Sequence, residues 1–223
     1  KRAPVSPSKT KLTPSPIHNF TPSLTRPACL WNPQNDPMTQ GLLKVTNVPE
    51  PIPSDLLKRC VDHTFEMYKP FAGRVLTDEE TISGCSEINV VPLSRSTSPG
   101  YPWCLDNPGV GKQHWLGKTD YVYSPEVIGK MTERLAAASK GIRTETIWID
   151  TLKDERRPHA KVLANKTRVF SCGPMDYIMA VRKLYGAFVG HVMDNRIKNE
   201  MCVGVNAYSQ EWTLIGHRLR EVG

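Results

Sequence analysis

The chain has 223 residues, of which 39% are hydrophobic, and a formal net charge of +7. This length allows one large domain or two small ones, and the composition is compatible with a packed core. No apolar run is long enough to span a membrane, and the N-terminal residues lack the apolar core of a signal peptide, which argues against a membrane or secreted protein. We therefore expect a soluble chain on the cytosolic side.

The positive charge is concentrated in two segments. Residues 1–35 contain five Lys/Arg and no acidic residue, and residues 153–168 contain six Lys/Arg and two acidic residues. The remainder of the chain is therefore slightly acidic. Such concentration is typical of sites for an anionic polymer or a triphosphate, although a basic run is also found on ordinary solvated surfaces.

Six cysteines are present, and none has the spacing of a CxxC pair or of a zinc finger with histidine. Without a signal peptide, free thiols in a reducing compartment are the expected state, and no metal site is predicted. The cysteines are Cys29, Cys60, Cys85, Cys104, Cys172 and Cys202.

Residues 1–53 hold eleven of the nineteen prolines. No helix is expected to run through prolines such as Pro4, Pro7 and Pro37, because proline lacks the backbone donor and clashes with the preceding turn. The segment also carries apolar anchors, among them Phe20. It is therefore predicted to be an extended arm with short strand pieces, laid across a larger body.

Two helices are predicted to follow the arm. Residues 54–69 form the first, with an N-cap at Ser54-Asp55 and a stop at Pro70. The second begins at a capping box formed by Thr77 and Glu80 and ends at the glycine four residues later.

Three longer helices are predicted further along the chain. Residues 124–139 have a proline in the first turn and Gly141 after the last one. Residues 176–194 read as a largely buried helix capped by Asp176, and residues 209–220 read as an amphipathic helix. The expected buried face of the helix at residues 124–139 consists of Val127, Ile128, Met131, Leu135 and Ala138.

The basic stretch 153–168 lies between two predicted strands. In residues 144–150, β-branched side chains alternate with other residues, which predicts a strand, and residues 167–171 are predicted to form a return strand. The six basic residues follow neither a helical stripe nor strict alternation. The stretch is therefore predicted to be a ribbon or long hairpin that projects from a body.

A turn-rich loop is predicted over residues 94–104. Its small hydroxyl residues and Gly100 allow another backbone to approach closely, and its amides and hydroxyls can donate to phosphate. The alternative is a plain surface turn.

Three segments resemble motifs of picornavirus-type RNA-dependent RNA polymerases, in the same order and with similar spacing. Residues 7–15 with His18 resemble the N-terminal segment, and residues 97–102 (Thr-Ser-Pro-Gly-Tyr-Pro) resemble motif G. Residues 153–168, with Lys-Asp-Glu-Arg-Arg at the start and Lys-Thr-Arg at the end, resemble motif F. The resemblance covers almost the whole chain, and insect picorna-like viruses, particularly iflaviruses and dicistroviruses, are the most similar group.

The resemblance implies an α+β fold, namely the fingers subdomain of a right-hand polymerase. Residues 1–53 would be an N-terminal index-finger arm that bridges fingers and thumb. Residues 54–223 would be the fingers, ending just before palm motif A. In the family the catalytic aspartates follow this region, so we expect a fragment that lacks the palm catalytic motifs and the thumb and does not polymerise RNA alone.

The same resemblance assigns roles to individual residues. The implied nucleotide-binding residues line the triphosphate entry or lie over the incoming base, where a guanidinium can stack and donate at once; they are Lys153, Arg157, Lys161 and Arg168. The implied contacts to the RNA template are made with its backbone rather than its bases; they are Thr97, Ser98, Gly100, Lys9, Lys11 and Lys166.

Three positions depart from the family pattern. Arg156 stands where an apolar residue is usual, so its direction and role are open. Asn165 replaces a common glycine, but asparagine tolerates a left-handed backbone and the turn is expected to survive. Trp103 replaces a frequent tyrosine and keeps an aromatic ring.

The family also implies cofactors and partners for the complete enzyme. Mg²⁺ or Mn²⁺ would be bound by carboxylates outside this chain, so no catalytic residue and no metal ligand is predicted within it. The implied partners are template and primer RNA, nucleoside triphosphates, the remaining palm and thumb, and a protein primer. The implied location is the host cytoplasm, at membrane-associated replication complexes.

Parts of the sequence are compatible with two other functions. A non-catalytic RNA-binding module would use the same basic ribbon and bind RNA with a steep salt dependence but no nucleotide incorporation. A cysteine protease with Cys172 and either His159 or His18 is disfavoured, because Ser171-Cys172-Gly173 lacks the first glycine of a Gly-x-Cys-Gly sequence.

Overall fold

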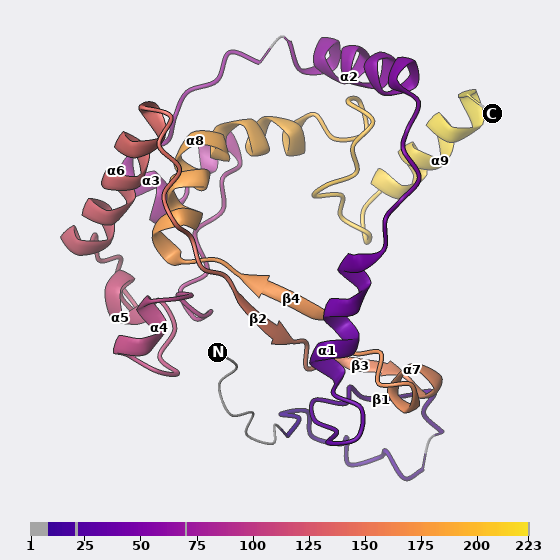
Figure 1. Cartoon of the computed structure of the whole chain (residues 1–223). Coiled ribbons are helices and arrows are strands. Elements are labelled where there is room, and N and C mark those ends of the chain that lie inside the picture. The colour runs from indigo at the N-terminus through magenta and orange to yellow at the C-terminus, as the bar shows by residue number, and fades with distance from the viewer. Residues whose placement is uncertain (1–8, 21, 70, 223) are drawn as a thin grey trace. The chain divides into compact units, whose positions relative to one another are not determined.

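The computed structural model describes residues 9–20, 22–69 and 71–222 and contains both helices and strands (Figure 1). The chain forms two compact units. The arm unit consists of the residues through Pro51 together with Trp148–Cys172, and the helical unit consists of Ile52–Ile147 together with the residues from Gly173 onward. Parts of three predictions lie outside the described residues: the arm up to residue 8, the helix stop at Pro70, and Gly223.

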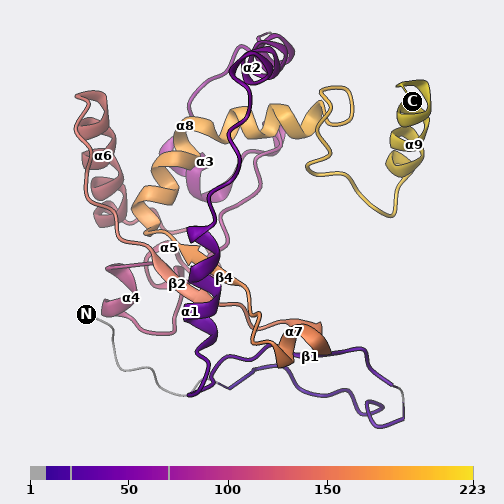
Figure 2. The ribbon, with the colours of Figure 1, turned by 45° about the vertical axis from the view of Figure 1, so that its right-hand side comes forward.

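The arm unit contains two antiparallel sheets of two strands each. Strand β2 (Ile149–Leu152) pairs with β4 (Val169–Cys172), and β1 (Thr25–Pro27) pairs with β3 (Arg156–Pro158) (Figure 1). β3 and helix α7 (His159–Leu163) lie in the connection between β2 and β4, and Figure 2 shows α7 beside β1. The predicted basic hairpin is therefore confirmed, and the outer part of the hairpin pairs with the arm.

The arm is extended and contains one strand, as predicted, but it also contains a helix. Helix α1 (Pro37–Leu42) continues into the 3-10 turn η1 (Leu43–Thr46). The carboxylate of Asp36 caps α1 by accepting from the amides of Met38 and Thr39. The prediction of no helix here is wrong because Pro37 occupies the first helical turn, where the missing N–H would have had no partner.

The first strand of the hairpin begins later than predicted. β2 starts at Ile149, and the hydroxyls of Thr144 and Thr146 instead accept hydrogen bonds from the Arg134 Nη1 atom at 2.8 and 2.7 Å. These two side chains are therefore committed to the helical unit rather than to a strand ladder. β4 confirms the predicted return strand with a slightly later start.

The five predicted helices all form, within a few residues of the expected bounds. Thr77 and Glu80 make the expected capping box, and Gly84 follows the helix that they start. Three short elements, η2, α4 and α5, were not predicted. The elements of the helical unit are α2 (Ser54–Tyr68), α3 (Asp78–Ser83), η2 (Ser86–Ile88), α4 (Trp103–Asp106), α5 (Gln113–Leu116), α6 (Pro125–Ser139), α8 (Met175–Asp194) and α9 (Glu211–Val222).

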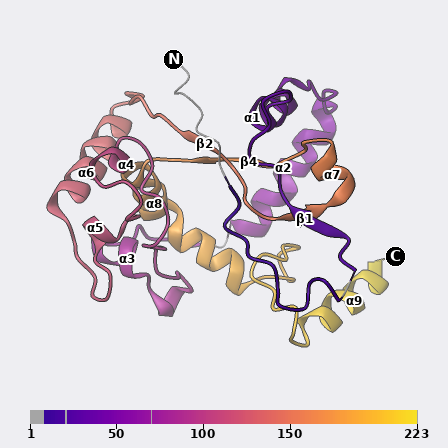
Figure 3. The same cartoon turned by 90° about the horizontal axis from the view of Figure 1, so that it is seen from below.

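The main core lies where α6 packs on α8 (Figure 3). Of the predicted face of α6, Val127 and Met131 are buried, Ile128 and Leu135 are partly buried, and Ala138 is exposed. The prediction was therefore correct except at the last turn. The buried residues of this core are Ile82, Trp103, Trp115, Leu116, Val127, Met131, Met175, Met179 and Ala180.

Helix α8 differs from its prediction in two respects. It is not largely buried, because Leu184, Tyr185 and Val189 are exposed and only one face meets the core. Asp176 is also not its cap, since Pro174 occupies that position. The buried Asp176 carboxylate instead accepts from Trp103 Nε1 at 2.8 Å and from Arg134 at 2.7 and 2.9 Å.

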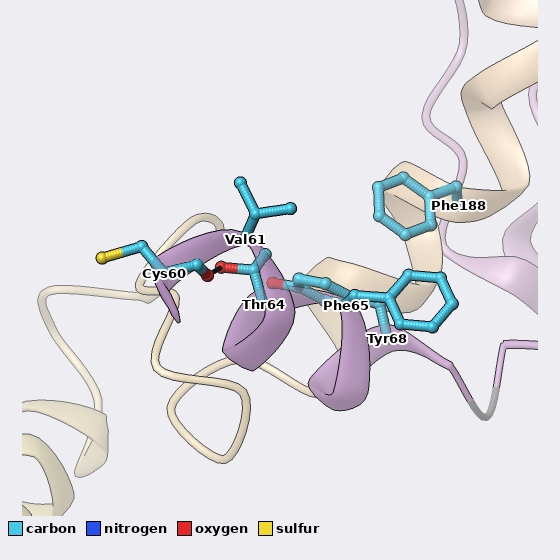
Figure 4. A pocket seen from close by; sticks show the side chains of 6 residues that line it. All are labelled: Cys60, Val61, Thr64, Phe65, Tyr68 and Phe188. Carbon is cyan, nitrogen blue, oxygen red and sulfur yellow. Dashed lines mark hydrogen bonds between the residues drawn. The ribbon is translucent and has the colours of Figure 1, made fainter. Parts of the chain in front are cut away.

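Helix α2 begins at Ser54, and Pro53 rather than the predicted Ser54 occupies its N-cap position. None of the residues within α2 is buried, although the Tyr68 ring packs edge-on against Phe188 of α8 with centroids 5.3 Å apart. An open apolar groove of about 520 Å³ lies beside this contact. Figure 4 shows the side chains that line it. No helix within the described ranges is both long and apolar enough to cross a membrane.

Two glycines in these helices provide a matched test of the packing. A Cβ at Gly190 would overlap the backbone carbonyl oxygen of Ile88, so Gly190→Ala is expected to lower the free energy of unfolding by about 1–3 kcal/mol. A Cβ at Gly129 meets no described atom within 4 Å, so Gly129→Ala is expected to raise it by about 0.5–1 kcal/mol. Chemical denaturation of the complete protein measures both, and equal stability of the two variants would contradict this packing.

Candidate RNA and nucleotide-binding site

The basic hairpin places the two ends of the predicted nucleotide site opposite each other. Beyond the β2–β4 ladder, the amide of Lys153 donates to the carbonyl oxygen of Arg168 at 2.8 Å. Antiparallel pairing therefore brings together two residues that are far apart in the sequence.

The carboxylate of Glu155 is the centre of this arrangement. Arg168 binds it with two guanidinium nitrogens, Nε at 2.5 Å and Nη2 more closely still. Lys153 Nζ lies 3.8 Å and Arg157 Nε 4.0 Å from the same carboxylate. Three of the four predicted nucleotide-binding residues thus form one group, here called the Glu155 cluster (Lys153, Glu155, Arg157 and Arg168).

The electrostatics of this cluster favour the ionised carboxylate. The hydrogen bonds from Arg168 lower the pKa of Glu155. Burial, the next largest effect, opposes them, and the charges of Arg168, Lys153 and Arg157 lower the pKa further. The same pairing raises the pKa of Arg168. Three cations and one anion leave a positive surplus, which suits a site for a polyanion.

Arg157 has an unsatisfied donor within this cluster. Its Nε atom is buried and has no hydrogen-bond partner among the described residues. A buried donor is costly to leave without an acceptor, so a ligand oxygen that reached Arg157 Nε would stabilise it. Buried donors without a partner are rare in native folds. Arg157 Nε is one of them, and it lies in the same cluster as the cations Lys153 and Arg168.

Lys161 and Lys166 lie on the α7 side of the hairpin and are exposed. Their backbones are joined by a hydrogen bond from the Lys166 amide to the Lys161 carbonyl oxygen at 2.9 Å. Between them Asn165 has a φ of 50°, so the predicted left-handed turn is confirmed. Neither lysine makes a described contact with the Glu155 cluster, so the fourth predicted nucleotide-binding residue, Lys161, stands apart from the other three.

The arm brings its own lysines to the hairpin through Asp154. This carboxylate accepts from Thr10 Oγ1 at 2.6 Å and from the Lys11 amide at 2.7 Å, and these bonds lower its pKa. The side chains of Lys9 and Lys11 are exposed at this point. The predicted arm contacts and the predicted motif F residues therefore belong to one unit.

Arg156, whose direction the sequence left open, points to the arm. Its Nε donates to Thr25 Oγ1 at 2.9 Å, and its Nη2 donates to Ser23 Oγ at 2.5 Å. Successive side chains of a strand point to opposite faces, so Arg156 and Arg157 have different partners. Recognising residues 156–158 as a strand (β3) would have predicted that Arg156 and Arg157 point to opposite faces.

The loop with the predicted template contacts belongs to the helical unit. Thr97 and Ser98 are exposed, whereas Gly100 is buried with a φ of 74°. A Cβ at Gly100 would overlap the carbonyl oxygen of Gly173, and the Met175 amide donates to the Pro99 carbonyl oxygen at 2.8 Å. The close approach predicted at Gly100 is therefore made by the chain's own backbone.

Two basic residues that the sequence did not single out hold this loop. The guanidinium of Arg95 donates to the carbonyl oxygens of Leu116, Gly117 and Asp120 and lies 4.2 Å from the centre of the Tyr121 ring. Lys112 Nζ donates to Thr97 Oγ1 and to the Ser98 carbonyl oxygen. Neither residue lies in a recognisable motif, so their roles depend on contacts that only the fold creates.

No group of three or more His, Cys, Asp or Glu residues in the described ranges could hold a metal ion. The residues present therefore do not fit a two-metal centre, and no chemical step is assigned to a metal on this chain. None of the six cysteines, all within the described residues, forms a disulfide.

The family model for viral RNA-dependent RNA polymerase matches residues 27–223. The chain belongs to this family. Among related proteins, this chain is 37% identical to the replicase polyprotein of Acute bee paralysis virus, over 97% of the chain and 12% of the polyprotein. It is 34% identical to that of Drosophila C virus, over 93% of the chain and 13% of the polyprotein.

A solved structure shares the fold. The chain matches the Sicinivirus 3Dpol RNA-dependent RNA polymerase with a TM-score of 0.79 and 25% identity, over 98% of this chain and 45% of that one. The predicted resemblance to right-hand polymerases of picorna-like viruses, insect viruses among them, is confirmed. The chain spans less than half of the solved relative and about an eighth of the replicase polyproteins.

The contacts of Arg156 predict that it fastens the arm. In Arg156→Ala, amides of residues 23–28 are expected to exchange with deuterium about tenfold faster, as expected for the loss of charge-assisted hydrogen bonds. Arg143→Ala removes another exposed arginine, from the helical unit, and serves as the control. Unchanged exchange in Arg156→Ala would show that the arm is held without this side chain.

Asp154 predicts a pH dependence of the same contact. Because its pKa is lowered in the folded state, the stabilisation is fully present above the ordinary aspartate pKa and is lost as the pH falls through the folded value. The amide proton of Lys11, observed by NMR with ¹⁵N-lysine, should titrate with a midpoint below about 3.9. Asp154→Asn should abolish this titration, and a midpoint at or above the ordinary value would contradict the contact.

Proposed function

We propose that this chain is the fingers part of a viral RNA-directed RNA polymerase that replicates a positive-strand RNA genome. The carrying observation is the Glu155 cluster, in which three cations, one with an unsatisfied donor, meet on a segment that resembles motif F. The reaction is attack of a primer 3′ hydroxyl on the α-phosphate of a nucleoside triphosphate. Residues 1–53 act as the index-finger arm that bridges to the thumb, and residues 54–223 act as the fingers.

The contribution of this chain is to position the nucleotide and to neutralise its charge. Lys153 and Arg157 bind the triphosphate, with Lys161 on the neighbouring turn, and Arg168 reaches both the base and the phosphates. Before the nucleotide arrives, Glu155 holds these cations together. When the triphosphate binds, its oxygens provide partners for donors that one carboxylate cannot satisfy, Arg157 Nε in particular.

The template is held through its backbone. Thr97, Ser98 and Gly100 belong to a loop whose shape is fixed by protein contacts, and Lys9, Lys11 and Lys166 add positive charge from the arm unit. Contacts of this type fix the position of RNA without reading its sequence. A polymerase needs this property because every template base must pass through the same site.

The remaining assignments concern the complete enzyme. Mg²⁺ or Mn²⁺ is its proposed cofactor and is assigned to no residue of this chain, which we propose to be inactive alone. Its partners are template and primer RNA, nucleoside triphosphates, the palm and thumb, and a protein primer. Its proposed location is the host cytoplasm, at membrane-associated replication complexes.

Substitution of two cations in the complete polymerase tests this function. Arg168→Ala and Lys161→Ala are expected to lower kcat/KM for nucleotide incorporation by about tenfold to a hundredfold, because each removes a charge-assisted contact to the triphosphate. Arg143→Ala and Lys140→Ala are the matched controls, since both residues are exposed on the helical unit. Single-nucleotide incorporation is measured at saturating template, together with the melting temperature.

The outcomes separate the candidate functions. Wild-type turnover in both variants at every nucleotide concentration would contradict the motif F assignment. If the unsubstituted protein binds RNA with a steep salt dependence but never incorporates nucleotides, it is an RNA-binding module instead.

A further inference from the structure

Lys112 is a buried lysine beneath the loop that carries Thr97 and Ser98. Only 7% of it is exposed. Its Nζ atom lies 2.5 Å from Thr97 Oγ1, 2.8 Å from the Ser98 carbonyl oxygen and 3.4 Å from the Thr97 carbonyl oxygen. Its backbone amide also donates to the Thr97 carbonyl oxygen, at 3.1 Å. Lysine is seldom buried so completely, because its ammonium group must regain there the hydrogen bonds that water would provide.

These contacts determine which way the loop faces. The carbonyl oxygens of Thr97 and Ser98 point toward Lys112, and the peptide bond that joins the two residues is trans, since Tyr101-Pro102 is the one cis bond in the described ranges. In a trans peptide the N–H points opposite to the C=O, so the Ser98 amide points away from Lys112. A phosphate is repelled by carbonyl oxygens and attracted by amide donors. Lys112 therefore turns the repulsive groups of the loop inward.

The turn that carries Lys112 is fitted directly against the loop. A Cβ at Gly111 would lie 2.7 Å from the Ser96 carbonyl oxygen, and Gly111 has a φ of 71°, which favours glycine. The hydroxyl of Thr97 accepts from Lys112 and donates to the Ser94 carbonyl oxygen at 3.1 Å. Both functions of this hydroxyl are thus used within the protein, and its role is to shape the loop.

We infer that Lys112 is a positioning residue for template RNA, which presents the outer edge of the Thr97–Ser98 loop to the RNA backbone. The inference deepens the proposed function and rests on its assignment of this loop to the template. Lys112 acts through the loop and does not contact the RNA. Its loss should therefore weaken RNA binding while nucleotide binding stays intact.

The test uses the complete polymerase with Lys112→Met, which keeps a long side chain but removes the ammonium group. Lys118→Met is the matched control, because Lys118 is an exposed lysine of the same unit. In Lys112→Met, amide exchange over residues 96–100 should be about tenfold faster and the Kd for primer–template RNA about tenfold higher. The KM for nucleotide at saturating RNA should stay within about twofold, as should all three quantities in Lys118→Met.

Two results would overturn the inference: unchanged exchange in the loop, or faster exchange with an unchanged RNA Kd. If Lys112→Met does not fold, Thr97→Val is the second variant, because it removes one acceptor of the Lys112 ammonium group. It should speed amide exchange over residues 96–100 and raise the Kd for RNA, both by a smaller factor than Lys112→Met. An unchanged Kd for RNA in Thr97→Val would overturn the inference. Failure of the proposed function is recognised separately, because the unsubstituted polymerase would then incorporate no nucleotide.

Discussion

Three cations can lie close together on this chain because one carboxylate lies among them. Lys153, Arg157 and Arg168 would repel one another without Glu155, whose lowered pKa shows that its charge is favoured by the same neighbours. The arrangement resembles an anion-binding site in which the Glu155 carboxylate takes the place of the bound anion. A carboxylate accepts through two oxygens and bears a single charge, so it organises the cations without satisfying all of their donors.

The period of two along residues 153–157 explains how the same segment also holds the arm. Lys153, Glu155 and Arg157 contribute to the cluster, while Asp154 and Arg156 bind the arm at Thr10, Lys11, Ser23 and Thr25. Alternate residues of an extended chain point to opposite sides, so one face carries the Glu155 cluster and the other meets the arm. Each face contains both an acidic and a basic side chain. Because both faces share one backbone, a change in the contacts with the arm would also affect the Glu155 cluster.

This alternation also shows what the sequence could and could not reveal. The sign of the charge does not alternate, so the basic residues alone follow neither a helical nor a strand period. Features set by local chemistry were predicted well, including the capping box at Thr77 and Glu80 and the left-handed turn at Asn165. Features set by distant partners were missed: the β1–β3 pairing and the burial of Asp176 and Lys112. No local pattern distinguishes a lysine in solvent from one that binds a loop fifteen residues earlier.

The helical unit and the arm unit thus use charge in opposite ways. Beneath residues 97–98, a buried cation gathers carbonyl oxygens and fixes a loop; within the hairpin, a partly buried anion gathers cations. In both cases contacts within the protein set the shape. On the proposed function, this would lower the entropy lost when RNA or nucleotide binds.

The most direct measurement is the structure of the complete polymerase with template, primer and an incoming nucleoside triphosphate. Triphosphate oxygens should lie within hydrogen-bond distance of Arg157 Nε and Arg168, beside an ionised Glu155. A triphosphate bound elsewhere, with Arg157 Nε still unpaired, would contradict the assignment of the Glu155 cluster to the nucleotide.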